Sequence, residues 1–318
     1  MEKLLIKGGN KLSGTITCAG AKNAALPMIA STILSDEKVT LKNLPYLQDI
    51  TTMFELLGSM GADILLDEDM NFTIQSNNLK DIEARYELVK TMRASILVLG
   101  PLLAKYGKAR IALPGGCAIG SRPVNYHLDS LRQMGAEIVL KNGYIEASAE
   151  NLQGASIRFD GVTVTGTENL MMAATLAEGT TTLLNVAREP EVADLASMLN
   201  SMGAKIDGAG SDQITIQGVE KLSGTSFEIP ADRIEAGTYL AAAAVTKGDI
   251  KIEGIDPNRL MKVIDKLINT GAKIDYDEDS ISFSTTNDIP DPVDITTAPF
   301  PEFPTDMQAQ FSVINAIS

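Results

Sequence analysis

One cysteine lies among glycines in the segment Leu113-Pro-Gly-Gly-Cys-Ala-Ile-Gly-Ser-Arg-Pro123. Glycine lets the backbone approach a ligand closely and turn its N–H groups toward it. The thiol of Cys117 stands among such dipoles and close to the guanidinium of Arg122, which makes it a candidate for a lowered pKa. Cys117 is therefore a candidate for chemistry. Taken alone, the segment favours the alternative, a surface turn with an incidental cysteine.

Further polar side chains stand where helices are predicted to begin. Lys22 and Asn23 open an Ala-rich helix, and Arg93 opens the corresponding helix of the next repeat. The first turn of a helix combines unpaired N–H groups with the positive end of the helix dipole, which favours anions. Together with Arg122, these residues indicate a clamp for phosphate or carboxylate. The alternatives are solvated surface charges and, for Asn23, a helix cap.

An aspartate follows a proline-aromatic segment in Phe300-Pro-Glu-Phe-Pro-Thr-Asp-Met-Gln308. This segment delivers Asp306 to the start of a predicted helix, where its carboxylate can serve as a general base. Thr305 or Asp306 can instead cap the helix by accepting backbone hydrogen bonds. The local sequence favours the cap.

Composition narrows the class of protein. The chain has 318 residues and a formal net charge of −14, which argues against a nucleic acid or an anionic membrane as partner. It has no apolar run long enough to span a membrane, and its charged start does not suit a signal peptide. Two cysteines make no disulfide framework, so we expect a cytoplasmic protein. A single histidine, His127, argues against a zinc site, and neither a metal nor a cofactor is expected.

A repeat organises the chain. The pattern Met/Thr-Gly-Ala-x-Ile recurs with its glycines at positions 61, 135, 203 and 271, so the intervals are 74, 68 and 68 residues. Each copy ends an apolar-periodic helix at a glycine and precedes short alternating strands. Another helix opens each unit, and these helices are predicted at Asn23–Leu34, Arg93–Ala104, Glu168–Ala177 and Glu235–Val245. The unit is βαβαββ, which predicts an α/β (α+β) fold.

The two ends of the chain suggest how the repeats are grouped. Residues 3–14 match the tail of a repeat at 213–224, and residues 307–318 match the opening helix of another. We therefore expect a complete catalytic lobe at residues 22–230, which carries the cysteine segment. Residues 1–21 and 231–318 are expected to form a second lobe, truncated at the C-terminus. On this interpretation the chain is a fragment or a shortened relative of a longer protein.

Several segments, in order along the whole chain, resemble the UDP-N-acetylglucosamine enolpyruvyl transferases (1-carboxyvinyltransferases) of the EPSP synthase superfamily. They are Gly20-Ala-Lys-Asn-Ala-Ala-Leu-Pro27, Leu113 to Val124, Ala187-Arg-Glu-Pro-Glu191, Asp232-Arg-Ile-Glu235 and Phe303-Pro-Thr-Asp-Met-Gln-Ala-Gln310. The resemblance implies a two-lobed inside-out α/β barrel of repeated βαβαββ units, incomplete at its C-terminus here. It also implies a monomer.

The resemblance further implies transfer of the enolpyruvyl group of phosphoenolpyruvate to the 3′-hydroxyl of UDP-N-acetylglucosamine, with release of phosphate. This reaction is the first committed step of peptidoglycan synthesis, and the family is the target of fosfomycin. By the same resemblance Cys117 is the proton donor and can add covalently to phosphoenolpyruvate, and Asp306 is the base. Lys22 and Asn23 contact phosphoenolpyruvate. The residues that contact UDP-N-acetylglucosamine are Arg93, Arg122, Pro123, Val124, Asn125, Tyr126, Thr163, Val164, Thr305 and Asp306.

Two other functions stay open. The enolpyruvyl transferase of the shikimate pathway shares the fold and phosphoenolpyruvate, but its loop does not use the Leu-Pro-Gly-Gly-Cys arrangement. A truncated, non-catalytic paralogue or fragment that binds the nucleotide sugar without turnover is the second alternative. The abrupt C-terminus favours it, whereas the presence of Lys22, Cys117, Arg122 and Asp306 argues against it.

Overall fold

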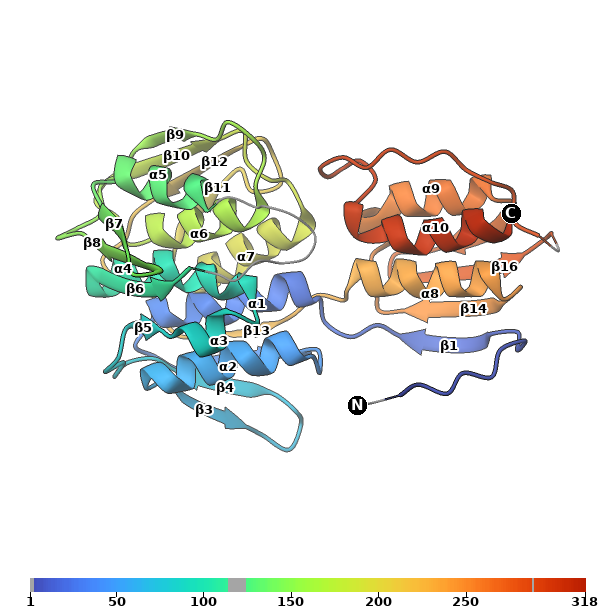
Figure 1. The fold of residues 1–318 in the computed structure, drawn as a ribbon, viewed down its shortest axis with the longest axis horizontal. Helices are drawn as coiled ribbons and strands as arrows, with labels where there is room; N and C mark the ends of the chain where they lie inside the picture. Colours follow the sequence, from blue (N-terminus) through green and yellow to red (C-terminus); the bar gives the residue numbers. More distant parts are fainter. Residues whose placement is uncertain (1–2, 114–123, 288) are drawn as a thin grey trace. The chain divides into compact units, whose positions relative to one another are not determined.

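The computed structural model describes residues 3–113, 124–287 and 289–318 (Figure 1). The chain divides into two compact units. The continuous unit comprises Lys22–Pro230, and the two-segment unit joins Met1–Ala21 to Ala231–Ser318.

The four sheets of the described residues share one topology. In each, the first two strands are parallel and the remaining neighbours are antiparallel. The continuous unit contains the sheets β13 (Ser226–Glu228)-β2 (Val39–Lys42)-β4 (Phe72–Gln75)-β3 (Asp63–Leu66), β5 (Glu83–Ala84)-β6 (Lys108–Ala112)-β8 (Tyr144–Ser148)-β7 (Glu137–Lys141) and β9 (Ser156–Arg158)-β10 (Thr180–Leu184)-β12 (Gln213–Gln217)-β11 (Lys205–Asp207). The two-segment unit contains β1 (Ser13–Thr17)-β14 (Asp249–Glu253)-β16 (Ser280–Thr285)-β15 (Ala272–Tyr276). This recurrence confirms the predicted repeat and fold class.

Two strands are exchanged between repeats. β1 directly precedes the first helix of the continuous unit, yet it pairs with β14, with Ser13 opposite Asp249. In return β13 precedes the first helix of the later segment but pairs with β2. This exchange explains why the two-segment unit draws residues from both ends of the chain.

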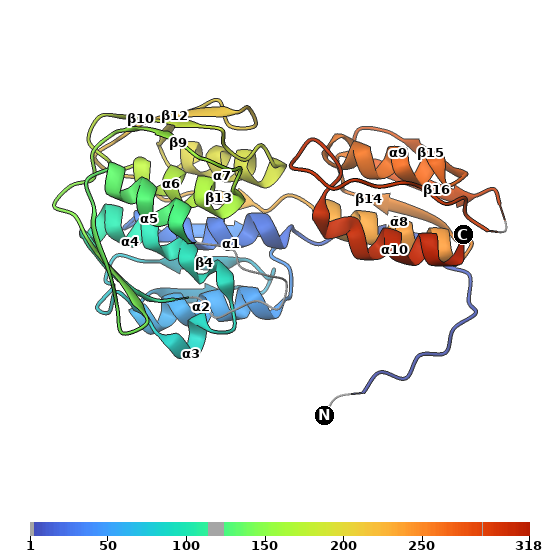
Figure 2. The same ribbon diagram turned by 45° about the horizontal axis from the view of Figure 1, so that its top comes forward.

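Helices form the interior of the continuous unit, and its sheets lie outside them (Figures 1 and 2). Its helices are α1 (Lys22–Ser31), η1 (Thr32–Leu34), α2 (Gln48–Met60), α3 (Tyr86–Val89), η2 (Arg93–Val98), α4 (Leu99–Tyr106), α5 (Asn125–Gln133), α6 (Val164–Ala174) and α7 (Pro190–Ser201). From Ala24 on, every residue of α1 is buried, and so is every residue of α6 from Gly166 on. Helices that are buried on all sides belong to the interior, which fits the largely apolar sequence of α1 and of the second half of α6.

The two-segment unit places its helices on its sheet. They are α8 (Arg233–Val245), η3 (Pro257–Leu260), α9 (Met261–Asn269), η4 (Thr305–Met307) and α10 (Gln308–Ile317). α8 and α9 contact the sheet, and α10 packs against α8 (Figure 2). The core between them contains the buried rings of Phe283, Phe303 and Phe311, among aliphatic side chains of α8 and α9.

Glycines end the second helix of each repeat, as the sequence predicts. Gly61, Gly135, Gly203 and Gly271 all have a positive φ, between 87° and 108°. Only glycine adopts this backbone conformation without a Cβ clash. The repeated glycines are therefore required by the backbone conformation at these helix ends.

The predicted starts at Asn23 and Glu235 lie one and two residues inside α1 and α8, and the other two predicted helices differ more from the structure. α6 begins at Val164, four residues before the predicted Glu168, because the hydroxyl of Thr163 caps it by accepting from the Gly166 N–H at 3.2 Å. The segment that opens at Arg93 begins as a 3₁₀ helix and becomes α-helical only at Leu99. Pro101 cannot donate a backbone hydrogen bond to the carbonyl four residues earlier, so the preceding turn closes with a bond from Leu99 to Ile96.

Two glycine-to-alanine substitutions test the packing. Gly218 lies against the backbone of Ala177, so a Cβ there would overlap the Ala177 carbonyl oxygen. We expect Gly218→Ala to lower the free energy of unfolding by about 2 kcal/mol or more. Gly58, within α2, has only Ile64 near its Cβ position, at 3.9 Å. Gly58→Ala is expected to raise stability by about 0.5–1 kcal/mol through helix propensity. Urea unfolding followed by circular dichroism measures both, and equal effects would contradict this packing.

Candidate active site

The described residues of the predicted site lie at the N-terminal ends of helices. Lys22 is the first residue of α1 and Arg93 the first of η2. Val124 and Thr163 occupy the N-cap positions of α5 and α6, and Asp306 lies in the first turn of η4. Helix starts present N–H groups and a positive partial charge, so the arrangement suits anionic ligands. Cys117, Arg122 and Pro123 fall outside the described residues, and their predicted roles stay predictions.

Lys22 holds its ammonium near the first turn of α2. Its Nζ lies 3.6 Å from Oδ2 of Asp49, and the two side chains are 42% and 38% exposed. An ion pair so exposed contributes about 0–1 kcal/mol. Asn23, the next residue, is exposed.

The start of α5 lies against the chain that leads into α6. The ring of Tyr126 stacks edge-on to Phe159, with centroids 6.5 Å apart and an interplanar angle of 83°. Its hydroxyl lies over Gly161, where a Cβ would stand 3.0 Å from the oxygen. These contacts bring the predicted residues Val124 to Tyr126 close to the segment that contains Thr163 and Val164.

Thr163 uses its polar atoms within the protein. Its hydroxyl caps α6, and its carbonyl accepts from the N–H and the hydroxyl of Thr167 at 3.1 and 2.7 Å. The Thr167 hydroxyl in turn accepts from the Ala187 N–H at 3.1 Å, which ties α6 to the turn before α7. A ligand at this place therefore meets Thr163 and Val164 through backbone groups or methyl surface.

A buried imidazole fixes α5 to α6. His127 is 4% exposed, and its Nδ1 lies 2.9 Å from Nδ2 of Asn169. Because the amide nitrogen donates, Nδ1 accepts, and Nε2 carries the proton toward the Thr165 hydroxyl at 3.4 Å. Burial lowers the pKa of His127 to about 4, so the ring is neutral near pH 7. His127 therefore has a structural role, because its hydrogen bonds fix α5 to α6.

Asn169, which sequence reasoning missed, is the partner that makes this possible. Its Oδ1 accepts from the Gly100 N–H at 2.7 Å, and its Nδ2 also donates to the Ile96 carbonyl at 3.3 Å. A Cβ at Gly100 would overlap the backbone and amide oxygens of Asn169. The close approach of α4 to α6 therefore requires glycine at position 100.

Three carboxyl groups gather where α6 meets α7. Glu168 is 1% exposed, and its Oε1 finds no hydrogen-bond partner among the described residues. Burial, followed by the charges of Glu191 and Glu189, raises the pKa of Glu168 well above its usual range. Burial at this place therefore favours the neutral, protonated form of Glu168. Sequence reasoning did not identify this buried acid, because a glutamate near a helix start is usually an exposed partner of the helix dipole.

Asp306 is presented between two buried anchors. Phe303 is 3% exposed and packs edge-on against Phe311, and Met307 is fully buried. The N-cap of η4 is Pro304, so the favoured interpretation of Thr305 or Asp306 as the cap is wrong. Both side chains are exposed. The carboxylate of Asp306 is therefore held at the surface of the two-segment unit by side chains packed in its core.

The other cysteine, Cys18, has a thiol of low reactivity. Cys18 is a free thiol, 5% exposed. Burial, with the nearby carboxylates of Glu235 and Asp232, raises its pKa to about 12. Those carboxylates are fixed in place, since Glu235 accepts from the Ala19 N–H at 2.9 Å and Asp232 caps α8. A thiol so strongly protonated is a poor nucleophile.

Neither a metal centre nor a membrane span emerges from the parts of the chain that the structure describes. No group of three or more His, Cys, Asp or Glu side chains there is arranged to hold a metal ion. No helix in those parts has the length and apolar character needed to cross a membrane.

The sequence of this chain is similar to those of one family of enzymes. The sequence profile of the family described as EPSP synthase (3-phosphoshikimate 1-carboxyvinyltransferase) matches residues 6–317. A protein of Hydrogenovibrio crunogenus named UDP-N-acetylglucosamine 1-carboxyvinyltransferase is 53% identical over 318 residues, which are all of this chain and 76% of that protein. A Coxiella burnetii protein of the same name is 54% identical over 319 residues, which cover 100% of this chain and 74% of that protein.

Solved structures show the same fold. The enolpyruvyl transferase NikO from Streptomyces tendae superposes with a TM-score of 0.85 at 22% identity, over 98% of this chain and 74% of that one. EPSP synthase from Acinetobacter baumannii superposes with a TM-score of 0.69 at 19% identity, over 97% of this chain and 70% of that one. At these identities the likeness concerns the fold.

The neutral His127 makes stability depend on pH. Its pKa falls from 6.5 to about 4 on folding, so the unfolded chain binds the proton first as the pH drops. The stabilisation is complete above about pH 6.5 and is lost as the pH falls toward 4, by about 3 kcal/mol in total. His127→Gln should lack this component. Urea unfolding of both proteins between pH 7 and 4 measures the difference, and parallel pH profiles would contradict the assignment.

The raised pKa of Cys18 predicts an unreactive thiol. A shift from 9.0 to about 12 lowers the thiolate fraction about a thousandfold at neutral pH. In a Cys117→Ser variant, iodoacetamide at pH 7.5 should leave the native protein unlabelled and label it readily in urea. Peptide mass spectrometry reads the result, with Cys18→Ser as the control. Rapid native labelling of Cys18 would show that the thiol is not shielded.

Proposed function

This chain belongs to the EPSP synthase family of enolpyruvyl transferases, and we propose that it transfers the enolpyruvyl group of phosphoenolpyruvate to the 3′-hydroxyl of UDP-N-acetylglucosamine. The observation that carries the proposal is identity of more than half, over the whole chain, to proteins named for this reaction. The protein is a transferase that acts on small molecules. We place it in the cytoplasm as a monomer working in peptidoglycan synthesis, and its free thiol Cys18 fits a reducing compartment.

The reaction is an addition followed by an elimination. The hydroxyl oxygen of the nucleotide sugar bonds to the central carbon of phosphoenolpyruvate while the methylene carbon accepts a proton, which gives a tetrahedral ketal. Loss of a methyl proton and cleavage of the carbon–oxygen bond to phosphate then release inorganic phosphate and leave an enol ether. The protein must therefore supply an acid, a base and cations that stabilise the shifting negative charge.

Cys117 is proposed as the acid that protonates the methylene carbon, and as the nucleophile of a covalent adduct. The chemistry of the other thiol supports this choice, because Cys18 is buried and its pKa is raised to about 12. Asp306 is proposed as the base that accepts the hydroxyl proton. Its exposed position beside the buried anchors Phe303 and Met307 supports that role, since a base must be held still and reach its substrate.

The helix starts are proposed to hold the charged parts of the substrates. Lys22 and Asn23 would bind phosphoenolpyruvate, and their place in the first turn of α1 supports this role. The guanidinium groups of Arg93 and Arg122 would contact UDP-N-acetylglucosamine and bind phosphate or carboxylate oxygens of the bound substrates. The remaining proposed contacts of UDP-N-acetylglucosamine are Pro123, Val124, Asn125, Tyr126, Thr163, Val164 and Thr305. The contact of Tyr126 with Gly161 supports a shared surface for this group.

The acceptor and the occurrence of turnover can be tested together. Phosphate release should require UDP-N-acetylglucosamine, and shikimate 3-phosphate should not replace it. Cys117→Ser and Asp306→Asn should each lower kcat by about a hundredfold or more, because each removes a proton-transfer group. Cys18→Ser is the matched control and should retain activity.

Two outcomes separate the alternatives. Turnover with shikimate 3-phosphate would favour the shikimate-pathway reaction. Saturable binding of the nucleotide sugar without phosphate release would favour the non-catalytic paralogue. Fosfomycin supplies a check that does not depend on turnover, because its epoxide should alkylate Cys117 and leave Cys18 unmodified in the mass spectrum.

A further inference from the structure

Each of the four described sheets has an edge strand that follows the helix-ending glycine of its repeat. These edge strands are β3, β7, β11 and β15, and Figure 1 shows β3 beside its neighbour β4. The free side of an edge strand presents backbone N–H and C=O groups that can pair with another extended chain, and proteins usually block it. The repeats can therefore be compared by how each edge is blocked.

A side chain of the preceding helix blocks the edge of β11. Asn200 lies three residues before the helix-ending glycine, and its Oδ1 accepts from the Ile206 N–H at 2.9 Å. Its Nδ2 donates to the Ile206 carbonyl, also at 2.9 Å. In the second repeat Arg132 stands at the same position and donates to the Ile138 carbonyl on β7 at 3.2 Å. This position of the repeat thus places a cap on the outward backbone groups of the edge strand.

The first repeat has no side chain at the capping position. Gly58 stands there, and Ile64 on β3 is the counterpart of Ile206. The Asp67 N–H donates to the Asn71 carbonyl at 3.0 Å, so these two residues form a bonded pair of the β3–β4 ladder. Bonded pairs alternate along an antiparallel ladder, so the N–H and C=O of Ile64 point away from β4. The edge of β3 therefore lacks the cap that β11 has.

The uncapped edge of β3 carries exposed apolar side chains between carboxylates. Leu65 and Leu66 are 63% and 51% exposed. Residues 63–69 contain four carboxylates and no basic side chain. Because side chains alternate between the two faces of a strand, Asp63, Leu65 and Asp67 lie on one face. The edge thus combines an apolar centre with a negative charge on either side.

The edge of β15 differs in its charge. Ile268 stands at the capping position of the fourth repeat and has no polar group to bond the edge strand. β15 carries charges of both signs, since Nζ of Lys273 lies 3.3 Å from Oδ2 of Asp275. Of these two edges, β3 is therefore the one whose charge selects a partner of a single sign.

The charges of β3 disfavour pairing with a second copy of the same edge. Antiparallel self-pairing about Leu65 would place Asp63 of one chain opposite Asp67 of the other, and like charges directly opposite are destabilising. A segment with a lysine or arginine two positions before and after an apolar residue reverses this effect. Strand addition takes its affinity from main-chain hydrogen bonds and its specificity from alternate side chains.

We propose that the edge of β3 binds an extended cationic segment of a partner protein as an additional strand. The backbone of that segment bonds the N–H and C=O of Ile64. Its apolar residue covers Leu65, and its two cations meet Asp63 and Asp67. This proposal stands apart from the transfer reaction, because it uses none of the residues assigned to the substrates.

A short peptide with blocked ends tests the pairing. The probe is Lys-Val-Leu-Val-Lys, and the charge-reversed control is Glu-Val-Leu-Val-Glu. The full chain is labelled with ¹⁵N-isoleucine, and an Ile64→Val variant identifies the amide signal of Ile64. The lysine peptide should shift this signal saturably. The glutamate peptide should bind at least about fivefold more weakly, because two cross-strand charge pairs change sign.

Substitution of Gly58 tests whether the peptide uses the backbone edge. Gly58→Asn introduces the side chain that caps β11 from the equivalent position, and a Cβ there has only Ile64 Cδ1 nearby, at 3.9 Å. It should weaken binding of the lysine peptide about tenfold, because the outward groups of Ile64 are then occupied. Gly58→Ala is the matched control. It adds a Cβ without a hydrogen-bonding group and should retain the affinity.

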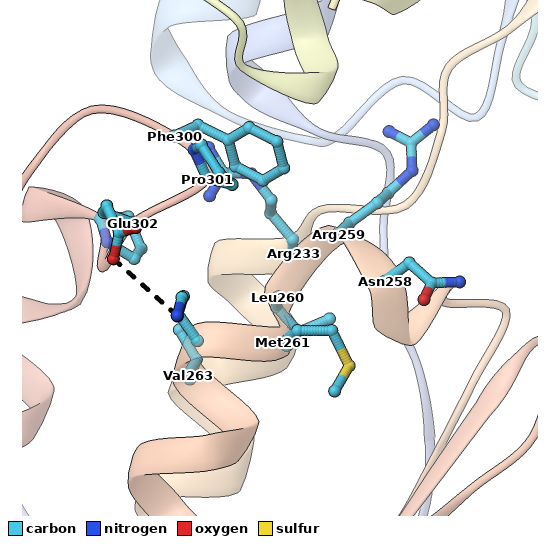
Figure 3. Close-up of a pocket in the computed structure, with 11 residues that line it drawn as sticks. Arg233, Asn258, Arg259, Leu260, Met261, Val263, Phe300, Pro301 and Glu302 are labelled. Carbon is cyan, nitrogen blue, oxygen red and sulfur yellow. Dashed lines mark ion pairs between the residues drawn. The ribbon is translucent and has the colours of Figure 1, made fainter.

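A charge variant tests the choice of a cationic partner. Asp63→Asn should weaken binding of the lysine peptide about two- to fivefold, because one cross-strand ion pair is lost. Glu302→Gln controls for the loss of one negative charge elsewhere on the chain. Glu302 lies in the two-segment unit, is 58% exposed at its side chain and stands 3.9 Å from Nζ of Lys262, the ion pair drawn in Figure 3. This control should leave the affinity unchanged.

Five results would overturn the proposal. They are no saturable shift of the Ile64 signal, equal affinity for the two peptides, equal affinity in Gly58→Asn and Gly58→Ala, equal losses in Asp63→Asn and Glu302→Gln, or shifts of the Ile64 signal when the protein alone is concentrated. The last result would assign the edge to a second copy of the chain. Isoleucine signals that are unchanged away from β3 show that each variant keeps its fold. Because no enzymatic activity is measured, failure here leaves the transfer reaction untouched.

Discussion

The buried amide of Asn169 satisfies a backbone N–H on α4, a carbonyl on η2 and an imidazole on α5 at the same time. Each of these partners would be costly to leave unpaired in the interior, so the arrangement allows little displacement of the helices. Gly100 makes the α4 contact sterically possible, and the neutral ring of His127 makes the α5 contact chemically possible. The first turn of α5, with Val124 to Tyr126, is placed by this set of bonds.

The rest of the continuous unit follows from helices enclosed by sheets. α1 and α6 are buried over most of their length, and the residues that remain accessible on them lie at their N-terminal ends. That geometry is compatible with the proposed binding of anionic substrates by a chain of net charge −14. Cations and unpaired N–H groups need to be dense only at a few helix starts, where the local field outweighs the distant carboxylates.

Much of the fold was predictable because its signals are local. Glycines at the four helix ends indicated positions where the backbone has a positive φ. Alternating polar and apolar residues, such as those at 213–217, indicated half-buried strands. The start of α6 was missed although its signal is local, since Thr163 caps the helix by accepting from the Gly166 N–H three residues later. Glu168 resembled an ordinary first-turn acid, yet it lies in the second turn and is buried. The hydrogen bonds of Asn169 depend on partners that are 42 to 73 residues away in the sequence. No local sequence pattern can predict them.

The exchange of β1 and β13 imposes an order on biosynthesis. β1 leaves the ribosome first, but its partner β14 follows 236 residues later, since Ser13 pairs with Asp249. At translation rates of about 5–20 residues per second, roughly ten to fifty seconds pass between the synthesis of β1 and that of its partner β14. The strands of the continuous unit are synthesised in that interval and pair only with one another in the described residues, so this unit can form its sheets before β14 exists. An unpaired strand can associate with other chains, and β1 is open to such association until β14 has been made.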